Sequence, residues 1–551
     1  MHLVVVESPA KAKTIEGYLG SDYKVIASLG HIRDLPSSEG SVKPDEDFKM
    51  IWELGDKGKK QAKTLNEAVK NSESLILATD PDREGEAIAW HVLEVLQEKG
   101  NLADKKISRV TFNAITKKEI NEAINNPREI DTEMVQAYLA RRALDYLVGF
   151  TLSPVLWRKL PGARSAGRVQ SVALRLICER EIEIESFIPQ EYWSVNSHFS
   201  YEDNDPFEAK LTHFDNKKLD QFDINNEGRS EEIKLAIQET NFKITDIQEK
   251  NVSRKPSPPF ITSTLQMEAS RKLNMTAKVT MMTAQKLYEA GLITYMRTDG
   301  VQIGKESIEE IRSSIGAIYG EDFLPDELRD YQGNIANAQE AHEAIRPTDP
   351  KKTPDIVKNE LNDDQYGLYS LIWKRTLASQ MENWRGMRTT VLINNEDGDI
   401  SFRASGTVTV FEGFRALYEE GRAEDKEELQ NLPKLVKDSS LANIKINTNQ
   451  HFTKPPPRFS EPSLVKSLEE KGIGRPSTYA SIISVLQDRN YVRLDKRYFY
   501  PEDKGRLVTS FLENFFRQYV GYDFTAQLEE NLDKVSNGEM NWKDFLNNFW
   551  G

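Results

Sequence analysis

The feature that most constrains the fold is an apolar segment followed at once by a run of acids. Residues 74–78 (SLILA) have the pattern of a buried strand, and Asp80, Asp82 and Glu84 follow closely. Like charges this close repel one another, so a compensating cation is expected, and hard carboxylate oxygens without Cys or His indicate Mg²⁺. The alternative is a helix N-terminus, where acids are favoured by the helix dipole, because residues 87–96 have a helical pattern.

The start of the chain repeats this order of strand, acid and helix. Residues 3–6 (LVVV) predict a buried strand that ends at Glu7, followed by a Ser8 N-cap and a helix to Tyr18 or Leu19. Further strands are predicted at 24–29 and 109–112, and a further helix at 115–124. Such alternation predicts a mostly parallel sheet with helices on both faces.

In a parallel sheet, ligands bind beyond the carboxyl ends of the strands. Glu7, Lys11 and the acids of residues 80–84 are therefore expected to meet at one edge of the sheet. Strand order cannot be derived from the pattern, so adjacency of these two strand ends is an inference. Four acids and a lysine that meet in space would suit a site for phosphate and metal.

Composition bounds the class of protein. A chain of 551 residues is too long for one core and is expected to hold several domains. The single cysteine, Cys178, excludes internal disulfides and Cys-based zinc sites, and it suits a reducing cytosol. No apolar run approaches membrane-spanning length, so we expect a cytoplasmic protein with no membrane partner. The net charge of −14 argues against a generic nucleic-acid binder, although charge distribution matters more than the sum.

No phosphate-binding loop of the Walker type is present. The segment 55–60 (GDKGKK) has the wrong spacing and lacks Ser or Thr after the lysine. We therefore expect a reaction that does not use ATP.

Residues 132–185 are predicted to form long helices that are unusually rich in cations. The break at 160–168 contains glycines that would allow close approach of a phosphate. Solvated helix faces are the alternative explanation, but seven cations in one region favour a track for a phosphate backbone. These cations are Arg141, Arg142, Arg158, Lys159, Arg164, Arg168 and Arg175.

Two β-rich stretches, 192–249 and 388–417, bracket a helical insertion from about 259 to 384. The simplest arrangement is one β-domain, built from both stretches, that carries the helical part on two connectors and so provides a hinge. Near the C-terminus, a helix at 461–471, a turn, a helix at 477–488 and a basic, aromatic hairpin at 491–500 resemble a winged helix-turn-helix. This element has two alternative interpretations: it contacts nucleic acid, or it is a small module that only packs against the rest of the fold.

The helical insertion contains a candidate nucleophile, Tyr295, with Arg297 two residues on. A phenol with a pKa of about 10 is a poor nucleophile at neutral pH, and a nearby cation lowers that barrier. Arginine can also stabilise a phosphoryl transition state. His342 could be a core histidine or a phosphate contact.

Seven segments resemble, in the same order, the motifs of the bacterial DNA topoisomerase I family, which is type IA. The segments are 6–15 (VESPAKAKTI), 30–36 (GHIRDLP), 78–86 (ATDPDREGE), 165–171 (SAGRVQS), 293–299 (ITYMRTD), 341–347 (AHEAIRP) and 472–479 (GIGRPSTY). The resemblance covers nearly the whole chain, and seven ordered motifs make a chance match negligible.

The resemblance implies a multidomain α/β, α and β fold: a Rossmann-like parallel toprim sheet followed by a toroidal core with winged-helix-like elements. The expected domains are a toprim domain (1–128), a helical DNA-binding domain (129–190 with 455–551), a β-rich arch (191–257 with 385–454) and a helical domain that carries the tyrosine (258–384).

The resemblance also implies residue roles. Tyr295 would form a 5′-phosphotyrosine with one DNA strand, Arg297 would stabilise the pentacoordinate phosphate, and Lys11 would contact the scissile phosphate. Glu7 would donate a proton to the departing 3′-oxygen and help to bind metal. Asp80, Asp82 and Glu84 would hold Mg²⁺. The expected DNA contacts are His31, Arg33, Arg141, Arg164, Arg168, His342, Arg346, Arg475, Ser477 and Thr478.

The activity so implied is ATP-independent relaxation of negative supercoils by cleavage of one strand, strand passage and rejoining. The substrate would be DNA, single-stranded at the cleavage site within a negatively supercoiled duplex, and the enzyme is expected to be a nucleoid-associated monomer. A decatenase like topoisomerase III, another toprim nucleic-acid enzyme and a single-strand binding module remain alternatives.

The chain departs from the family pattern at two places. Gly300 stands where the family more often has Ser. The family usually continues into C-terminal zinc modules or basic repeats, which this sequence lacks, so we expect the catalytic core of a longer protein.

Overall fold

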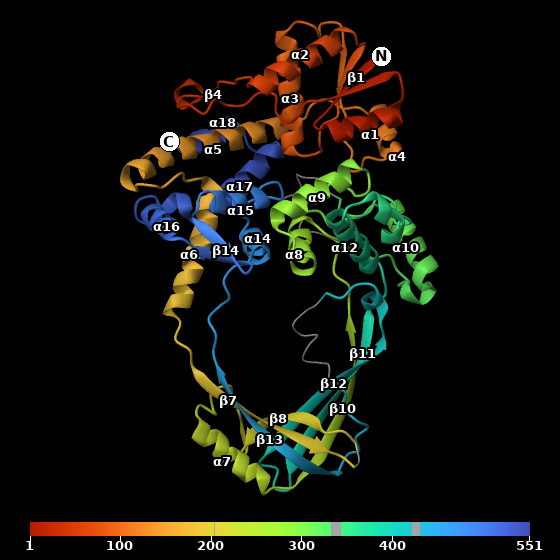
Figure 1. Cartoon of the computed structure of the whole chain (residues 1–551), viewed down its shortest axis with the longest axis vertical. Helices are drawn as coiled ribbons and strands as arrows, with labels where there is room; N and C mark the ends of the chain where they lie inside the picture. Colours follow the sequence, from red (N-terminus) through yellow and green to blue (C-terminus); the bar gives the residue numbers. More distant parts are fainter. Residues whose placement is uncertain (203, 332–342, 421–429) are drawn as a thin grey trace.

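The computed structural model describes residues 1–551 apart from 203, 332–342 and 421–429. The parts of the chain follow one another around a ring (Figure 1). An α/β domain lies at the top, helical parts lie on both sides below it, and a β-rich part closes the ring at the far end. This arrangement agrees with the toroidal fold expected from the sequence.

The N-terminal domain contains a four-stranded parallel sheet with the strand order β2-β1-β5-β6. Apolar side chains on one face of the sheet pack with α1 and α4, and those on the other face pack with α2 and α3. The predicted parallel sheet with two covered faces is therefore confirmed. Its elements are β1 (His2–Val6), α1 (Pro9–Leu19), β2 (Tyr23–Ala27), β3 (Val42–Lys43), η1 (Pro44–Glu46), β4 (Lys49–Met50), α2 (Asp56–Lys70), β5 (Ser74–Leu77), α3 (Arg83–Glu98), β6 (Lys106–Arg109) and α4 (Lys117–Asn125).

One predicted strand was wrong: the last strand is Lys106–Arg109 and not 109–112. Arg109 is fully buried, and its guanidinium donates to Glu86 and to the carbonyl oxygens of Leu77 and Thr79. The Val110 N–H still donates to the Leu77 carbonyl oxygen at 2.9 Å, and beyond it the Arg109 side chain occupies the carbonyl oxygens of Thr79 and Asp80.

The long helices and the C-terminal part share one hydrophobic core. The helix–turn–helix–hairpin order predicted near the C-terminus is present and continues into three more helices. The elements are α5 (Thr132–Lys159), α6 (Arg168–Ser186), α14 (Glu461–Glu470), α15 (Tyr479–Asp488), β14 (Val492–Asp495), β15 (Tyr498–Pro501), α16 (Asp503–Phe515), η6 (Arg517–Val520), α17 (Tyr522–Ser536) and α18 (Trp542–Trp550).

The part that carries Tyr295 is helical and lies directly below α1 and α4 (Figure 1). Its core is continuous with the apolar side chains on the α1 and α4 side of the N-terminal sheet. Its elements are α8 (Thr262–Leu273), α9 (Ala277–Glu289), α10 (Lys305–Tyr319), η2 (Glu321–Phe323), α11 (Pro354–Val357), η4 (Lys358–Glu360) and α12 (Asp363–Ser379).

The β-rich part is one seven-stranded sheet with the order β12-β11-β10-β13-β7-β8-β9. β12 also pairs with β8 through Ser401 to Arg403, so the sheet closes on itself. α7 packs on its core through Ile233 and Ile237. The elements are β7 (Glu191–Ser200), β8 (Phe207–Phe214), β9 (Lys217–Lys218), α7 (Glu227–Gln238), β10 (Phe242–Arg254), β11 (Trp384–Asn395), β12 (Ser401–Phe411), η5 (Gly413–Ala416) and β13 (Ser440–Phe452).

Strands from both sides of the helical insertion therefore form one sheet, and β10 and β11 pair along their length as they connect it to the tyrosine part. The exact domain boundaries stay a prediction. In the described ranges, no helix has both the length and the apolar content needed to span a bilayer.

Candidate active site

The site begins where two neighbouring strands end. β1 pairs with β5, with Val5 opposite Leu77, so Glu7 and Asp80 leave the sheet side by side. The Asp80 backbone N–H donates to Glu7 Oε1 at 3.1 Å. The adjacency that the sequence left open is therefore present in the fold.

The acidic run is also the N-terminus of α3. Asp82 is the N-cap, and its carboxylate accepts from the Gly85 backbone N–H at 2.7 Å. Gly85 lies against the preceding backbone, because a Cβ there would be 2.1 Å from the Asp80 carbonyl oxygen. The interpretation as a helix N-terminus is therefore confirmed, while the interpretation as a metal site stays a prediction.

Lys11, in the first turn of α1, is the buried cation that the acids require. Its side chain is 0% exposed, and Nζ contacts Asp80 Oδ1 and, at 3.2 Å, Glu7 Oε2. Burial acts against the charged form, but the Asp80 and Glu7 charges raise the pKa of Lys11. Burial and the Asp80 charge raise the pKa of Glu7 well above its usual range, so Glu7 is the acid most ready to carry a proton.

Tyr295 lies across the domain boundary from these groups. Its phenol O–H donates to Asp82 Oδ2 at 2.6 Å, and its backbone N–H donates to the Asn113 carbonyl oxygen at 2.8 Å. The side chain is 1% exposed. Burial and the Asp82 charge raise the pKa of Tyr295 well above its ordinary value, so the phenol is neutral in this closed arrangement.

Arg297 completes the contact from the tyrosine side. Its Nη1 lies 3.1 Å from Glu84 Oε2 and 3.6 Å from Asp82 Oδ2. His31 Nε2 lies 3.6 Å from Glu84 Oε1, and the His31 ring stacks on Tyr138. The structure thus brings together the predicted nucleophile, the predicted arginine and the predicted acids.

These residues have the donor chemistry of a magnesium site. Four carboxylates, Glu7, Asp80, Asp82 and Glu84, are only partly offset by the two cations Lys11 and Arg297. Among the described residues, however, no three His, Cys, Asp or Glu side chains are grouped so that they could hold a metal ion. Asp80 is engaged by Lys11, Asp82 by Tyr295, and Glu84 by Arg297. The oxygen ligands suit Mg²⁺, and a metal would have to exchange with these protein partners.

Comparison with known proteins decides the family. Residues 129–547 match the family model described as DNA topoisomerase, and residues 2–115 match the Toprim domain. The chain belongs to the DNA topoisomerase family. Its N-terminal α/β part is a Toprim domain, a fold generally associated with divalent metal binding.

Similar topoisomerases span the whole chain. DNA topoisomerase 1 of Rickettsia felis is 54% identical over 560 residues, which cover all of this chain and 72% of that protein. The Zymomonas mobilis DNA topoisomerase 1 is 53% identical, with all of this chain and 45% of that protein covered. Full-length topoisomerase I from Thermotoga maritima matches with a TM-score of 0.87 and 38% identity over all of this chain and 89% of that one. The alternative of a decatenase like topoisomerase III is not favoured.

Several arginines predicted to contact DNA lie in a buried ion-pair network of this topoisomerase. We call it the arginine cluster, and the acids at its centre, Glu529 and Asp533, lie one turn apart on α17. Glu529 accepts from Arg168 and from Arg141, the latter at 3.1 Å, and Asp533 accepts from Arg475 at 2.6 Å and from Arg83. The members of the arginine cluster are Arg83, Arg141, Arg168, Arg475, Glu529 and Asp533.

The remaining predicted DNA contacts occupy varied positions. Arg33 is buried over the Trp52 and Trp90 rings and donates to His91 Nδ1 at 2.6 Å. Arg346 is also buried, and it pairs with Glu343 at 2.7 Å. Arg164 is exposed at the glycine loop. Ser477 and Thr478 are half-buried before α15, and His342 lies outside the described residues.

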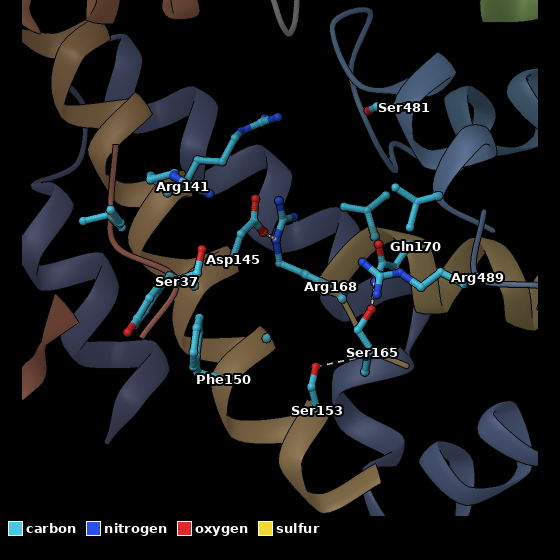
Figure 2. A pocket seen from close by; sticks show the side chains of 18 of the residues that line it. Ser37, Arg141, Asp145, Phe150, Ser153, Ser165, Arg168, Gln170, Ser481 and Arg489 are labelled. Carbon is cyan, nitrogen blue, oxygen red and sulfur yellow. Dashed lines mark hydrogen bonds and ion pairs between the residues drawn. The ribbon is translucent and has the colours of Figure 1, made fainter. Parts of the chain in front are cut away.

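A cavity of about 700 Å³ lies between α5, the glycine loop, α6 and α15 (Figure 2). Arg168 reaches into it and is held by Asp145 at 2.9 Å. Arg142, Phe150, Trp157 and Arg489 also line it. Cations and rings together are the lining expected of a path for single-stranded nucleic acid.

The sequence analysis missed two groups of residues. Glu529 and Asp533 are buried carboxylates, and their only sequence signal is a four-residue spacing beside the apolar Leu528 and Leu532. Tyr288 is the other omission. It lies in the last turn of α9, three residues before Gly291. This position indicates that it is near Tyr295, but nothing in the sequence indicates its contact with Lys11.

Proposed function

We propose that the chain is an ATP-independent type IA DNA topoisomerase. It cleaves one DNA strand through a 5′-phosphotyrosine at Tyr295, passes a strand through the break, rejoins it and so relaxes negative supercoils. The observation that best supports this proposal is the phenol of Tyr295, held against Asp82 and beside Arg297 where two domains meet.

The proposed chemistry is a transesterification. Tyr295 Oη bonds to the scissile phosphorus while the bond from phosphorus to the 3′-oxygen breaks. Asp82, which already accepts the phenol hydrogen bond, is placed to take the phenolic proton. Glu7, whose pKa is raised by burial and by Asp80, is placed to give a proton to the 3′-oxygen. Rejoining reverses both transfers, and the phosphotyrosine conserves the energy of the linkage, so no nucleotide is consumed.

Two cations bind the scissile phosphate in this scheme. Arg297 stabilises the charge that develops on the pentacoordinate phosphate, and Lys11 contacts the scissile phosphate from the Toprim side. In the closed arrangement both are held by carboxylates, Arg297 by Glu84 and Lys11 by Asp80. A DNA phosphate would compete with these acids for the two cations.

We propose that the Toprim acids Glu7, Asp80, Asp82 and Glu84 hold Mg²⁺. A bound divalent ion would offset the repulsion between these acids and the DNA phosphates. If so, the double variant Asp80→Ala with Asp82→Ala should rejoin DNA poorly, with a rejoining rate that no longer depends on Mg²⁺ concentration. Unchanged Mg²⁺ dependence would refute this metal assignment.

We propose that the DNA is single-stranded at the cleavage site and belongs to a negatively supercoiled duplex at the nucleoid. The cavity beside Arg168 supports a single-stranded path, because rings and cations line it. The residues that we still propose to contact the DNA backbone are Arg164, His31, Arg346, Ser477 and Thr478. Four other predicted contacts are buried and would have to exchange their present partners for a DNA phosphate: Arg33, Arg141, Arg168 and Arg475. We propose a monomer, which light scattering with and without DNA would test.

The decisive experiment is capture of the covalent adduct. A single-stranded oligonucleotide labelled at its 3′ end should remain attached to the denatured protein after incubation. Tyr295→Phe should abolish this label transfer. Tyr369→Phe is a matched control, because Tyr369 is an equally buried tyrosine of the same domain whose hydroxyl donates to the Lys352 carbonyl oxygen. An adduct that survives in Tyr295→Phe would refute the proposal.

A further inference from the structure

Tyr288 is a fully buried tyrosine that lies between the nucleophile and the Toprim lysine. Its ring meets the Tyr295 ring edge-on, with 5.2 Å between centroids and 66° between planes. Lys11 Nζ lies 5.3 Å from the centroid of the same ring. A single side chain of the tyrosine domain therefore touches one reacting group of its own domain and one of the opposite domain.

The hydroxyl of Tyr288 has no hydrogen-bond partner among the described residues, although its atom is buried. Buried hydroxyl groups are nearly always paired, because an unpaired one destabilises the fold. Two other buried tyrosines of this domain follow the rule: Tyr295 donates to Asp82, and Tyr369 donates to the Lys352 carbonyl oxygen. The phenol of Tyr288 is thus an exception at the centre of the site.

The surroundings of this hydroxyl are those of a hydrogen-bond donor. Burial and the nearby charges of Asp80 and Glu7 raise the pKa of Tyr288 well above its ordinary value, so the proton stays on oxygen. A protonated phenol beside Lys11 and Tyr295 suits an anionic oxygen. The scissile phosphate is such a group, because the proposed reaction requires it to lie between Lys11 and Tyr295.

The contact that positions Tyr288 also joins the two domains. The next residue, Glu289, accepts from Ser8 Oγ at 2.6 Å through Oε1 and from Thr14 Oγ1 at 3.2 Å through its carbonyl oxygen. Ser8 and Thr14 lie on the Toprim side, with Ser8 as the N-cap of the helix that carries Lys11. When the domains close, this contact places the Tyr288 ring against Lys11.

We propose that Tyr288 is a further catalytic residue of strand cleavage and rejoining, whose hydroxyl donates a hydrogen bond to a non-bridging oxygen of the scissile phosphate. Its ring holds Lys11 and Tyr295 on either side of that phosphate. This inference rests on the proposed function, because it needs a phosphate between the two groups.

The test is Tyr288→Phe, which removes one hydroxyl and keeps the ring. We expect the single-turnover rates of oligonucleotide cleavage and rejoining to fall about 10- to 100-fold, the loss expected for one hydrogen bond to a charged group. The thermal unfolding midpoint should stay the same or rise, because the hydroxyl has no protein partner to lose. Oligonucleotide affinity, measured by anisotropy in a Tyr295→Phe background, should change little.

Tyr369→Phe is the matched control, because it removes a hydroxyl that does have a partner. It should lower the unfolding midpoint and leave the cleavage and rejoining rates unchanged. A purely structural Tyr288 would give wild-type rates in Tyr288→Phe, and that result would overturn the inference. If the unaltered protein forms no adduct, the proposed function itself fails, so the two failures are distinguishable.

Discussion

Two interfaces hold the Toprim domain to the rest of the ring, and they use the same side-chain types differently. The first, which we call the gate contact, pairs Ser8, Asp82 and Glu84 with Glu289, Tyr295 and Arg297. The second joins the Toprim domain to the helical part that contains α5 and α17, and the arginine cluster belongs to it through the pair of Arg83 with Asp533. At the gate contact, the side chains of Arg297 and Glu84 are 32% and 47% exposed, whereas those of Arg83 and Asp533 in the cluster are 8% and 4% exposed.

The difference shows that exposure, and not residue type, decides whether an ion pair is permanent. Loss of one partner from a buried pair costs about 3–5 kcal/mol, whereas exposed pairs contribute about 0–1 kcal/mol. Ion pairs at the gate contact can therefore part and re-form. Closure there depends more on apolar burial, because the core of the tyrosine domain is continuous with Ile115 and its Toprim neighbours.

The largest expected effect is on the arginine cluster. Glu529→Ala would leave Arg141 and Arg168 without their shared acceptor, so we expect a loss of about 3–5 kcal/mol in unfolding free energy. Denaturant unfolding followed by tryptophan fluorescence measures this loss. Glu530→Ala, at the exposed neighbouring position, is the control. Equal unfolding midpoints for the two variants would show that the cluster does not stabilise the fold.

Acid should weaken the same cluster. Burial opposes ionisation of Glu529, but the charges of Arg141 and Arg168 lower its pKa below the usual glutamate value. A lowered folded-state pKa adds stability above the unfolded pKa of about 4.3, and this stability is lost as pH falls through the folded value, by up to about 1.4 kcal/mol per pH unit. Unfolding midpoints between pH 6 and 3 should therefore fall more steeply in the wild type than in Glu529→Gln. Parallel curves would contradict this prediction.

Gly291→Ala should act on the gate contact alone. Gly291 has a φ of +75°, and an added Cβ would lie 2.5 Å from the Ile115 carbonyl oxygen of the Toprim domain. We expect the closed arrangement to lose about 1–3 kcal/mol, and adduct formation to fall about fivefold or more. Distance labels on α2 and α10 would report a wider separation. Gly320→Ala, at a positive φ with open space around it, is the control for backbone strain.

The smallest effect is expected at the rim of the gate contact. Lys118 pairs with Glu306 across the two domains at 2.8 Å, but both side chains are more than half exposed. Because solvent screens this pair, Lys118→Ala should leave both the unfolding midpoint and the adduct yield unchanged. A large loss of closure, seen with the same distance labels, would show that surface charge contributes to the gate after all.

Much of the site was predictable because its residues lie in short segments. The apolar run before Asp80 and the one before Glu7 predicted parallel strands, and their pairing brings the two acids together. The roles of Tyr295 and Asp82 followed from the family resemblance, not from spacing, and their direct contact was not predicted. The arginine cluster could not be predicted, because Arg168 and Glu529 are far apart in sequence and a buried arginine has the same local pattern as one on a solvated helix face. The strand at 106–109 was predicted at 109–112, because the apolar pattern of a sequence does not show that an arginine such as Arg109 is buried.

The pairing of β12 with β8 has a mechanical consequence for the ring. A cylinder of strands bonded all the way round resists shear, whereas an open sheet could splay when its ends are pulled apart. The far end should therefore move as a stiff body, and the bending should fall on the chain segments that enter and leave it. Such a cylinder also presents few unpaired amides to other protein molecules. The β-rich end is therefore protected from strand-to-strand aggregation even when the ring is open.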